Sequence, residues 1–268
     1  MPIAWLLSIG NEILIGRIVN TNAAWLAKKL TFMGFTVKRI ITVPDDLNEI
    51  KEELARASQR ADLVITTGGL GPTYDDKTAE AIAYSLNLEM EKNPEALRLV
   101  EKFYMEKNMK LTQERLKMAI LPRGAIVFPN PVGAAPGFAI ERDGFSVIAL
   151  PGVPNEMKSI FENYVEDFLK KKFTLKRIFT EYCVKIIGVP ESGLAPTINS
   201  VAKKYAGLVY LKSHPKGHET RGPILEIRAL ASGTKAEEAS KLARKVLEDV
   251  IEEALRLGGK VGDIQERC

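Results

Sequence analysis

Short apolar runs alternate along the first half of the chain with longer stretches in which apolar residues recur every three or four positions. The apolar run at residues 3–9 stops at Gly10, as a buried strand does, and the apolar run at 63–66 stops at a glycine-rich stretch. Residues 35–43 are rich in strand-forming residues and stop at Pro44, so they are read as a further strand. The stretches at 20–33, 47–59 and 78–86 carry apolar residues at helical spacing. This alternation predicts an α/β fold with a doubly wound, mainly parallel sheet.

The pattern changes near residue 172. Before it, helices are expected at 94–108, 112–120 and 154–171, a strand at 125–128, and a hairpin with strands at 137–141 and 145–150. After it, the expected order is strand, helix, two strands and helix, at 181–187, 192–203, 208–212, 224–230 and 236–257. We therefore expect a first domain over residues 1–172 and a second, smaller α+β domain over residues 175–260.

Composition narrows the class of protein only modestly. The 268 residues carry a formal net charge of +4 and no dominant block of lysine and arginine, so nucleic-acid binding is not expected. The N-terminal apolar run is too short for a signal peptide or a membrane span, which predicts a cytoplasmic protein without membrane contact. The two cysteines, Cys183 and Cys268, argue against a disulfide framework, and both are expected to be reduced.

The most informative segment is the glycine-rich loop at residues 66–78, Thr-Thr-Gly-Gly-Leu-Gly-Pro-Thr-Tyr-Asp-Asp-Lys-Thr. Gly68, Gly69 and Gly71 leave backbone N–H groups unshielded ahead of a predicted helix, and such an arrangement receives phosphate. The spacing fits neither the Walker A loop nor the dinucleotide fingerprint, because Tyr74 stands where the latter needs its third glycine. A tight strand-to-helix turn without a ligand is the simpler alternative.

Acidic residues follow this loop and also the strand before it. Asp75 and Asp76 would repel a phosphate unless a cation lay between them, so the segment predicts a phosphate site with a divalent metal ion. Ligands of open α/β sheets bind at the carboxyl ends of the strands, where Glu12, after the first strand, and Asp45, after the second, should join the loop. Helix capping is the alternative role of Asp45 and Asp46.

Two later loops could also approach a ligand. Residues 130–137 form a small-residue loop, and residues 150–157 form a turn that leads into a helix. Both could equally be ordinary turns, since proline and glycine punctuate loops in general. Glu156 lies in the first turn of the predicted helix, where an acid stabilises the helix dipole whatever its function.

Taken together, these segments resemble the molybdopterin-binding (MoCF-type) fold and, within it, the CinA family. The Thr-Thr-Gly-Gly-x-Gly and Asp-x-Thr elements at 66–78 are similar to the signature of the whole superfamily, whereas residues 8–14, 135–138 and 150–157 look more like CinA. The resemblance implies that the second domain is KH-like. Bacterial CinA proteins carry a further C-terminal domain with nicotinamide-mononucleotide deamidase activity, which this chain lacks, so deamidation is not expected.

The resemblance also implies hydrolysis of a pyrophosphate such as that of ADP-ribose, with Mg²⁺, Mn²⁺ or Co²⁺. Asp76 would be the metal ligand and Asp45 a co-ligand or the base that orients water, with Asp75 as a further metal ligand. A metal that neutralises the pyrophosphate and activates water explains why no histidine or cysteine is needed. The residues expected to contact the phosphate or the nucleotide are Ser8, Gly10, Asn11, Glu12, Thr67, Gly68, Gly69, Gly71, Pro72, Thr73, Gly133, Pro136 and Gly137.

Two other functions stay open. Proteins that bind or adenylylate molybdopterin share the signature, so the expected ligand is a small nucleotide or pterin phosphate. A non-catalytic nucleotide-sensing module is the other alternative, prompted by the KH-like domain. Residues 188–200 lack the Gly-x-x-Gly loop with which KH domains hold nucleic acid, which again makes nucleic acid an unexpected partner. The expected assembly is a homodimer.

Overall fold

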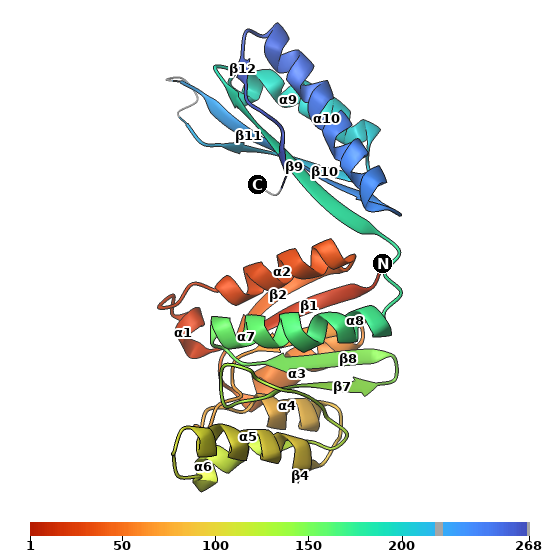
Figure 1. Ribbon diagram of the computed structural model, residues 1–268. Helices are drawn as coiled ribbons and strands as arrows, with labels where there is room; N and C mark the ends of the chain where they lie inside the picture. Colours follow the sequence, from red (N-terminus) through yellow and green to blue (C-terminus); the bar gives the residue numbers. More distant parts are fainter. Residues whose placement is uncertain (218–221, 267–268) are drawn as a thin grey trace. The chain divides into compact units, whose positions relative to one another are not determined.

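The computed structural model describes residues 1–217 and 222–266, and the chain forms two compact units (Figure 1). Residues 1–31 and 35–174 make up the first unit, and residues 32–34 together with the chain from residue 175 onward make up the second. Each unit has its own sheet and its own buried apolar cluster, so each is described by itself.

A six-stranded sheet forms the centre of the first unit, in the order β2-β1-β3-β8-β7-β6. The first four of these strands are parallel to one another, whereas β7 and β6 run antiparallel at one edge. This arrangement confirms the predicted α/β class with a mainly parallel sheet. The strands are β1 (Ile3–Ile9), β2 (Thr36–Val43), β3 (Leu63–Thr67), β6 (Ile126–Phe128), β7 (Gly137–Arg142) and β8 (Phe145–Leu150).

Helices connect these strands at the positions that apolar periodicity predicts. They are α2 (Thr21–Met33), α3 (Leu47–Ser58), α4 (Thr78–Ser85), α5 (Pro94–Glu106) and the run formed by α7 (Pro154–Ile160), the π-turn η2 (Phe161–Val165) and α8 (Glu166–Lys172). Asp46 caps α3, because its side chain accepts the N–H groups of Asn48 and Glu49. The capping alternative therefore holds for Asp46 and leaves the neighbouring Asp45 for another role.

Several short elements were not predicted. They are α1 (Asn11–Leu14) and, between α4 and β6, a two-stranded sheet of β4 (Met90–Lys92) and β5 (Ile120–Pro122). The short helix α6 (Gln113–Leu116) and the 3-10 turn η1 (Lys117–Ala119) lead into β5. The predicted helix at 112–120 is therefore wrong at its end, since Ile120 begins a strand. Pairing of Ile120 with Lys92 overrides the local helical spacing, as tertiary contacts commonly do.

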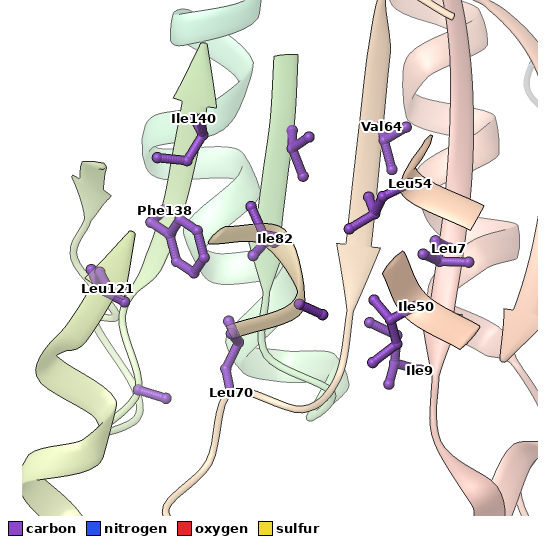
Figure 2. Close-up of a cluster of buried hydrophobic side chains, with 14 of the residues drawn as sticks. Leu7, Ile9, Ile50, Leu54, Val64, Leu70, Ile82, Leu121, Phe138 and Ile140 are labelled. Atoms are coloured by element: carbon purple, nitrogen blue, oxygen red, sulfur yellow. The ribbon is translucent and has the colours of Figure 1, made fainter. Parts of the chain in front are cut away.

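One core cluster of the first unit lies between a face of the sheet and the helices that cover it. Figure 2 shows Phe138 and Ile140 of β7 in the same cluster as Ile82 of α4 and as Leu70, which belongs to the glycine loop itself. Phe138 is fully buried, and the side chain of Leu70 is only 8% exposed. Burial of Leu70 stabilises the loop by roughly 2 kcal/mol of apolar transfer, so the loop has a fixed position relative to the sheet.

An antiparallel sheet in the order β10-β11-β9-β12 forms the second unit, and β13 also pairs with β9. The helices α9 and α10 contact this sheet, and alternate residues of β9 such as Tyr182, Val184 and Ile186 are buried with them. The order of the first five elements is the predicted one. The elements are β9 (Ile178–Ile187), α9 (Glu191–Lys204), β10 (Val209–Pro215), β11 (Ile224–Gly233), α10 (Ala236–Arg256), β12 (Lys260–Val261) and β13 (Gln265–Glu266).

Cys183 lies on β9 and is disulfide-bonded, so the prediction of a reduced thiol at this position is wrong. The prediction rested on cysteine number and on the strand pattern around Cys183, and neither shows where the end of the chain runs. In the structure, β13 returns the chain to β9 and pairs Gln265 with Cys183. Cys268 lies outside the described residues.

The helices of the described part of the chain include none with both the length and the apolar character that crossing a bilayer requires.

Candidate functional site

A cavity of about 620 Å³ lies at the carboxyl ends of β1, β2 and β3 in the first unit. Parallel strands bring these ends to one edge of the sheet, and the segments that follow them supply most of the cavity wall. The starts of α2 and α7 complete it, with Asn20, Thr21 and Pro154. The predicted site residues that line the cavity are Glu12, Asp45, Thr67, Gly68, Gly69, Gly71, Pro72, Thr73, Asp75 and Asp76.

The glycine loop is held tightly where it leaves β3. Gly68 has φ +101°, and a Cβ at this position would lie 2.2 Å from the carbonyl oxygen of Ile9. A Cβ on Gly69 would lie 2.2 Å from Oγ1 of Thr78. The backbone therefore needs glycine at both positions for close packing as well as for any ligand.

Not all the glycine amides are free for a phosphate. The Gly68 N–H donates to the carbonyl oxygen of Leu150 at 3.0 Å, so this amide is already used inside the fold. Thr78 closes the base of the loop, because its N–H donates to Gly69 O at 3.1 Å and its hydroxyl donates to Gly68 O at 2.8 Å. An oxyanion at the loop would therefore be held by the amides beyond Gly68.

Asp76 is fixed within the turn that follows the glycines. Its Oδ2 accepts the Thr73 N–H at 2.8 Å and also the Thr73 hydroxyl. Gly71 makes room for this carboxylate, since a Cβ there would lie 2.7 Å from the same oxygen. Both hydrogen bonds end on Oδ2, which leaves Oδ1 able to accept a further partner.

Asp45 is held by the neighbouring strand end. Its Oδ2 accepts the backbone N–H of Asn11 at 2.8 Å, and the Gly10 N–H just before donates to Val43 O at 3.1 Å. Gly10 and Asn11 therefore position Asp45 and do not themselves line the cavity. Asp45 and Asp76 come from the ends of β2 and β3, which flank β1, and both face the same cavity.

Glu156 is an acid that sequence patterns explained as helix stabilisation, yet it lines the cavity. Its Oε2 accepts a hydrogen bond of 2.7 Å from Nδ2 of Asn130, which also donates to Ala135 O. A Cβ on Gly133 would lie 2.3 Å from the Glu156 carboxyl carbon, so the glycine leaves space for the acid. The small-residue loop thus supports Glu156.

The cavity is acidic. Glu12, Asp45, Asp75, Asp76 and Glu156 line it, and none of its lining side chains in the described ranges 1–217 and 222–266 is a lysine, arginine or histidine. The Thr73 hydroxyl, and after it the Asp75 backbone N–H and the charges of nearby lysines, lower the pKa of Asp75, so this group is ionised at neutral pH. An anionic ligand would enter such a cavity only together with cations.

These donors fit a hard divalent cation. Carboxylate oxygens are the ligands of Mg²⁺ and Mn²⁺, and Mg²⁺ typically takes only one or two of them and completes its shell with phosphate and water. Within the described residues no group of three or more acidic, histidine or cysteine side chains lies close enough to hold a metal alone. The arrangement therefore suits a metal that is shared with a bound phosphate.

Some predicted residues do not reach the cavity. Ser8 is buried, and its Oγ accepts a 2.9 Å hydrogen bond from Nδ2 of Asn20, whose Oδ1 in turn accepts the Ala23 N–H in the first turn of α2. Gly137 begins β7, where a Cβ would meet the Ala149 carbonyl oxygen at 3.1 Å. Pro136 lines a second, smaller cavity of about 270 Å³, which Gly69, Leu70 and Gly71 also line.

Three side chains that support the wall of the cavity were not predicted from the sequence. Asn22 donates to the Gly152 carbonyl at 2.8 Å and ties the start of α2 to the turn before α7. Asn130 holds Glu156, and Lys117 contacts the turn of Asp76. Nothing in the local pattern around Asn130 or Lys117 indicated a contact with a segment 26 or 41 residues away.

Known proteins resemble the chain over different lengths. The profile of a family described as a probable molybdopterin binding domain matches residues 5–171. A protein of Aeropyrum pernix is 47% identical over all of this chain and 98% of its own length, and one of Pyrobaculum arsenaticum is 51% identical over 93% of each. The crystal structure of CinA from Thermoplasma acidophilum, a protein of unknown function, is 42% identical, covers 62% of this chain and 97% of its own, and has a TM-score of 0.59.

Proposed function

This chain belongs to the family of probable molybdopterin binding domains, and we propose that its first unit is a CinA-like, metal-dependent hydrolase of nucleotide pyrophosphates such as ADP-ribose. The observation that carries the proposal is the cavity at the strand ends, which five carboxylates and the glycines of the loop line together, without a lysine, arginine or histidine among the lining residues that the structure describes. A diphosphate needs a cation to enter such a site, and a metal-bridged diphosphate is a group that hydrolysis can act on.

The residues have separate tasks in this proposal. Asp76 would hold the metal through Oδ1, since Thr73 already occupies Oδ2. Asp45 would be a second ligand or would orient the attacking water, with its rotamer fixed by the Asn11 N–H. When bound, the metal would neutralise phosphate charge and lower the pKa of a coordinated water.

Other parts of the wall would position the ligand. Gly69 lies beside the start of α4, since its carbonyl oxygen accepts the Thr78 N–H, and the dipole at a helix start favours phosphate. Ile13, Ile18 and Val19 add apolar surface at one side of the cavity, which suits the rings of a nucleotide or a pterin. At about 620 Å³ the cavity lies within the usual range for small-molecule sites.

The direct experiment is a hydrolysis assay. Purified protein incubated with ADP-ribose and Mg²⁺, Mn²⁺ or Co²⁺ is expected to release AMP and ribose 5-phosphate, and an excess of EDTA is expected to stop the release. Product formation is followed by chromatography. Release that continues unchanged in EDTA would refute the metal-dependent part of the proposal.

The same preparation separates the alternatives. Tighter binding of a molybdopterin-type pterin phosphate than of ADP-ribose would favour the second candidate, which the family's description supports. Binding of ADP-ribose without any turnover would favour a sensor. The cytoplasmic location, the homodimer and the KH-like character of the second unit remain proposals, and light scattering tests the dimer.

A further inference from the structure

Lys117 holds the acidic turn from outside the cavity. Its Nζ lies 2.5 Å from the carbonyl oxygen of Thr73 and 2.7 Å from that of Asp76. The two carbonyls stand at the two ends of the turn that carries the metal-ligand candidates Asp75 and Asp76. A single ammonium group therefore bridges the turn, and each contact is a short, charge-assisted hydrogen bond.

The lysine comes from a distant part of the chain. It begins η1, at the end of the excursion between α4 and β6, and it lies 41 residues beyond Asp76. Lys117 is half-buried and forms no ion pair within the described residues, so the carbonyl oxygens are its partners there. Its neighbours Met118 and Ala119 are buried in the core, which fixes where the lysine stem begins.

The other hydrogen bonds of the turn join Thr73 and Asp76 to each other. The Thr73 N–H and hydroxyl donate to Asp76 Oδ2, and the Asp76 N–H donates to Thr73 O at 3.3 Å, a long hydrogen bond, while Thr73 itself is exposed. The tight glycine packing and the Thr78 bonds hold only the base of the loop. Mutual repulsion among the carboxylates would open the turn further, so a cation that binds its backbone is well placed to keep it closed.

From this geometry we propose that Lys117 is a positioning residue, which holds Thr73, Asp75 and Asp76 in the arrangement that binds the metal. It acts through the backbone carbonyls and needs no contact with the substrate. This inference rests on the proposed function for the identity of the metal ligand, but the order of the turn can be measured independently.

The two possible roles of Lys117, positioning the ligands and simple charge repulsion of the metal, predict opposite changes in divalent-cation affinity for the uncharged variant Lys117→Met. Removal of a positive charge beside an acidic cavity would by itself strengthen binding of a divalent cation. If Lys117 orders the ligands instead, its removal weakens binding, and loss of an outer supporting partner typically costs about 10- to 100-fold in metal affinity. The direction of the change therefore distinguishes the two roles.

The experiment measures Mn²⁺ affinity by titration calorimetry without substrate, and amide hydrogen exchange of peptides that cover residues 70–78. Lys117→Met is expected to bind Mn²⁺ at least about tenfold more weakly and to exchange faster at the turn. Lys117→Arg, which keeps the charge and the donors, should restore part of both and serves if the methionine variant does not fold. Lys110→Met, an exposed lysine of the same excursion, is the matched control and should change neither.

Unchanged exchange in Lys117→Met, or Mn²⁺ binding that is equal or tighter, would overturn the inference. If the wild-type protein binds Mn²⁺ but does not hydrolyse ADP-ribose, the proposed function fails. The Mn²⁺ affinities and exchange rates of the Lys117 variants then still decide whether Lys117 positions the metal ligands. If the wild-type protein binds no Mn²⁺, the positioning of metal ligands is refuted, and the exchange rates then show only whether Lys117 orders the turn.

Discussion

Replacement of Asp76 by asparagine is expected to reduce kcat/KM for ADP-ribose by about 100- to 1,000-fold, because a metal ion contributes several kcal/mol to transition-state stabilisation and each 1.36 kcal/mol is a factor of ten. The asparagine side chain has the same shape, and its amide oxygen can still accept the two hydrogen bonds from Thr73. Its NH₂ group would then point where the carboxylate offers Oδ1, and it cannot bind a cation.

The matched control is Asp143→Asn, the same chemical change in the same unit. Asp143 lies in the turn between β7 and β8, its side chain is 92% exposed, and its φ of +50° is one that asparagine tolerates. This control should retain wild-type activity, and both variants should keep the wild-type Tm. Equal activity of Asp76→Asn and wild type would show that the metal is held elsewhere or is not needed.

Replacement of Gly68 by alanine is expected to lower the Tm by roughly 5–15 °C and to abolish ligand binding. Two costs add here. An L-residue in the left-handed region costs about 1–2 kcal/mol, and the new Cβ would overlap the Ile9 carbonyl oxygen at 2.2 Å, for which overpacking costs of about 1–3 kcal/mol are typical. For a chain of about this size each kcal/mol corresponds to roughly 2–4 °C.

Gly124→Ala provides the control, because Gly124 has φ +83° but nothing lies within 4 Å of a Cβ at that position. It carries the conformational cost alone and should lower the Tm by only about half as much, with ADP-ribose binding unchanged. Calorimetry and ligand titration on the two variants separate backbone strain from the overlap with β1. Equal Tm shifts for the two alanine variants would show that contact with Ile9 does not determine the loop conformation.

The convergence of Asp45 and Asp76 could be predicted because it follows from topology. Each acid lies in the segment that follows a parallel strand, Asp45 after β2 and Asp76 after β3, and carboxyl ends of parallel strands share an edge of the sheet. Apolar runs and helical periodicity were sufficient to identify those strands, since β1, β3 and β8 are buried almost throughout. The cavity therefore follows from the order of elements.

Contacts between distant segments could not be predicted in this way. Lys117 meets the Asp76 turn only because β4 and β5 pair and bring η1 back to the loop, and strands of three residues leave almost no periodicity to detect. The support of Glu156 by Asn130 depends on how the small-residue loop folds. The disulfide of Cys183 likewise depends on contacts that the local strand pattern does not show.

The sequence also does not show which of the glycine N–H groups are free to bind phosphate. Three glycines within four positions indicate exposed amides, but the Gly68 amide is satisfied by Leu150, and the absence of a side chain at Gly68 serves contact with Ile9. The pairing of β3 with β8 decides which of the loop N–H groups remain free for a ligand. Leu70, apolar and placed between the glycines, fixes the loop in the core.

A crystal structure of the protein with Mn²⁺ and ADP-ribose, with data collected at a wavelength where manganese scatters anomalously, tests the central claim most directly. We predict one anomalous peak in contact with the carboxylates of Asp76 and Asp45 and with oxygens of a diphosphate that lies against Gly69 and Gly71. A diphosphate bound away from these glycines, or manganese that contacts neither aspartate, would contradict the account.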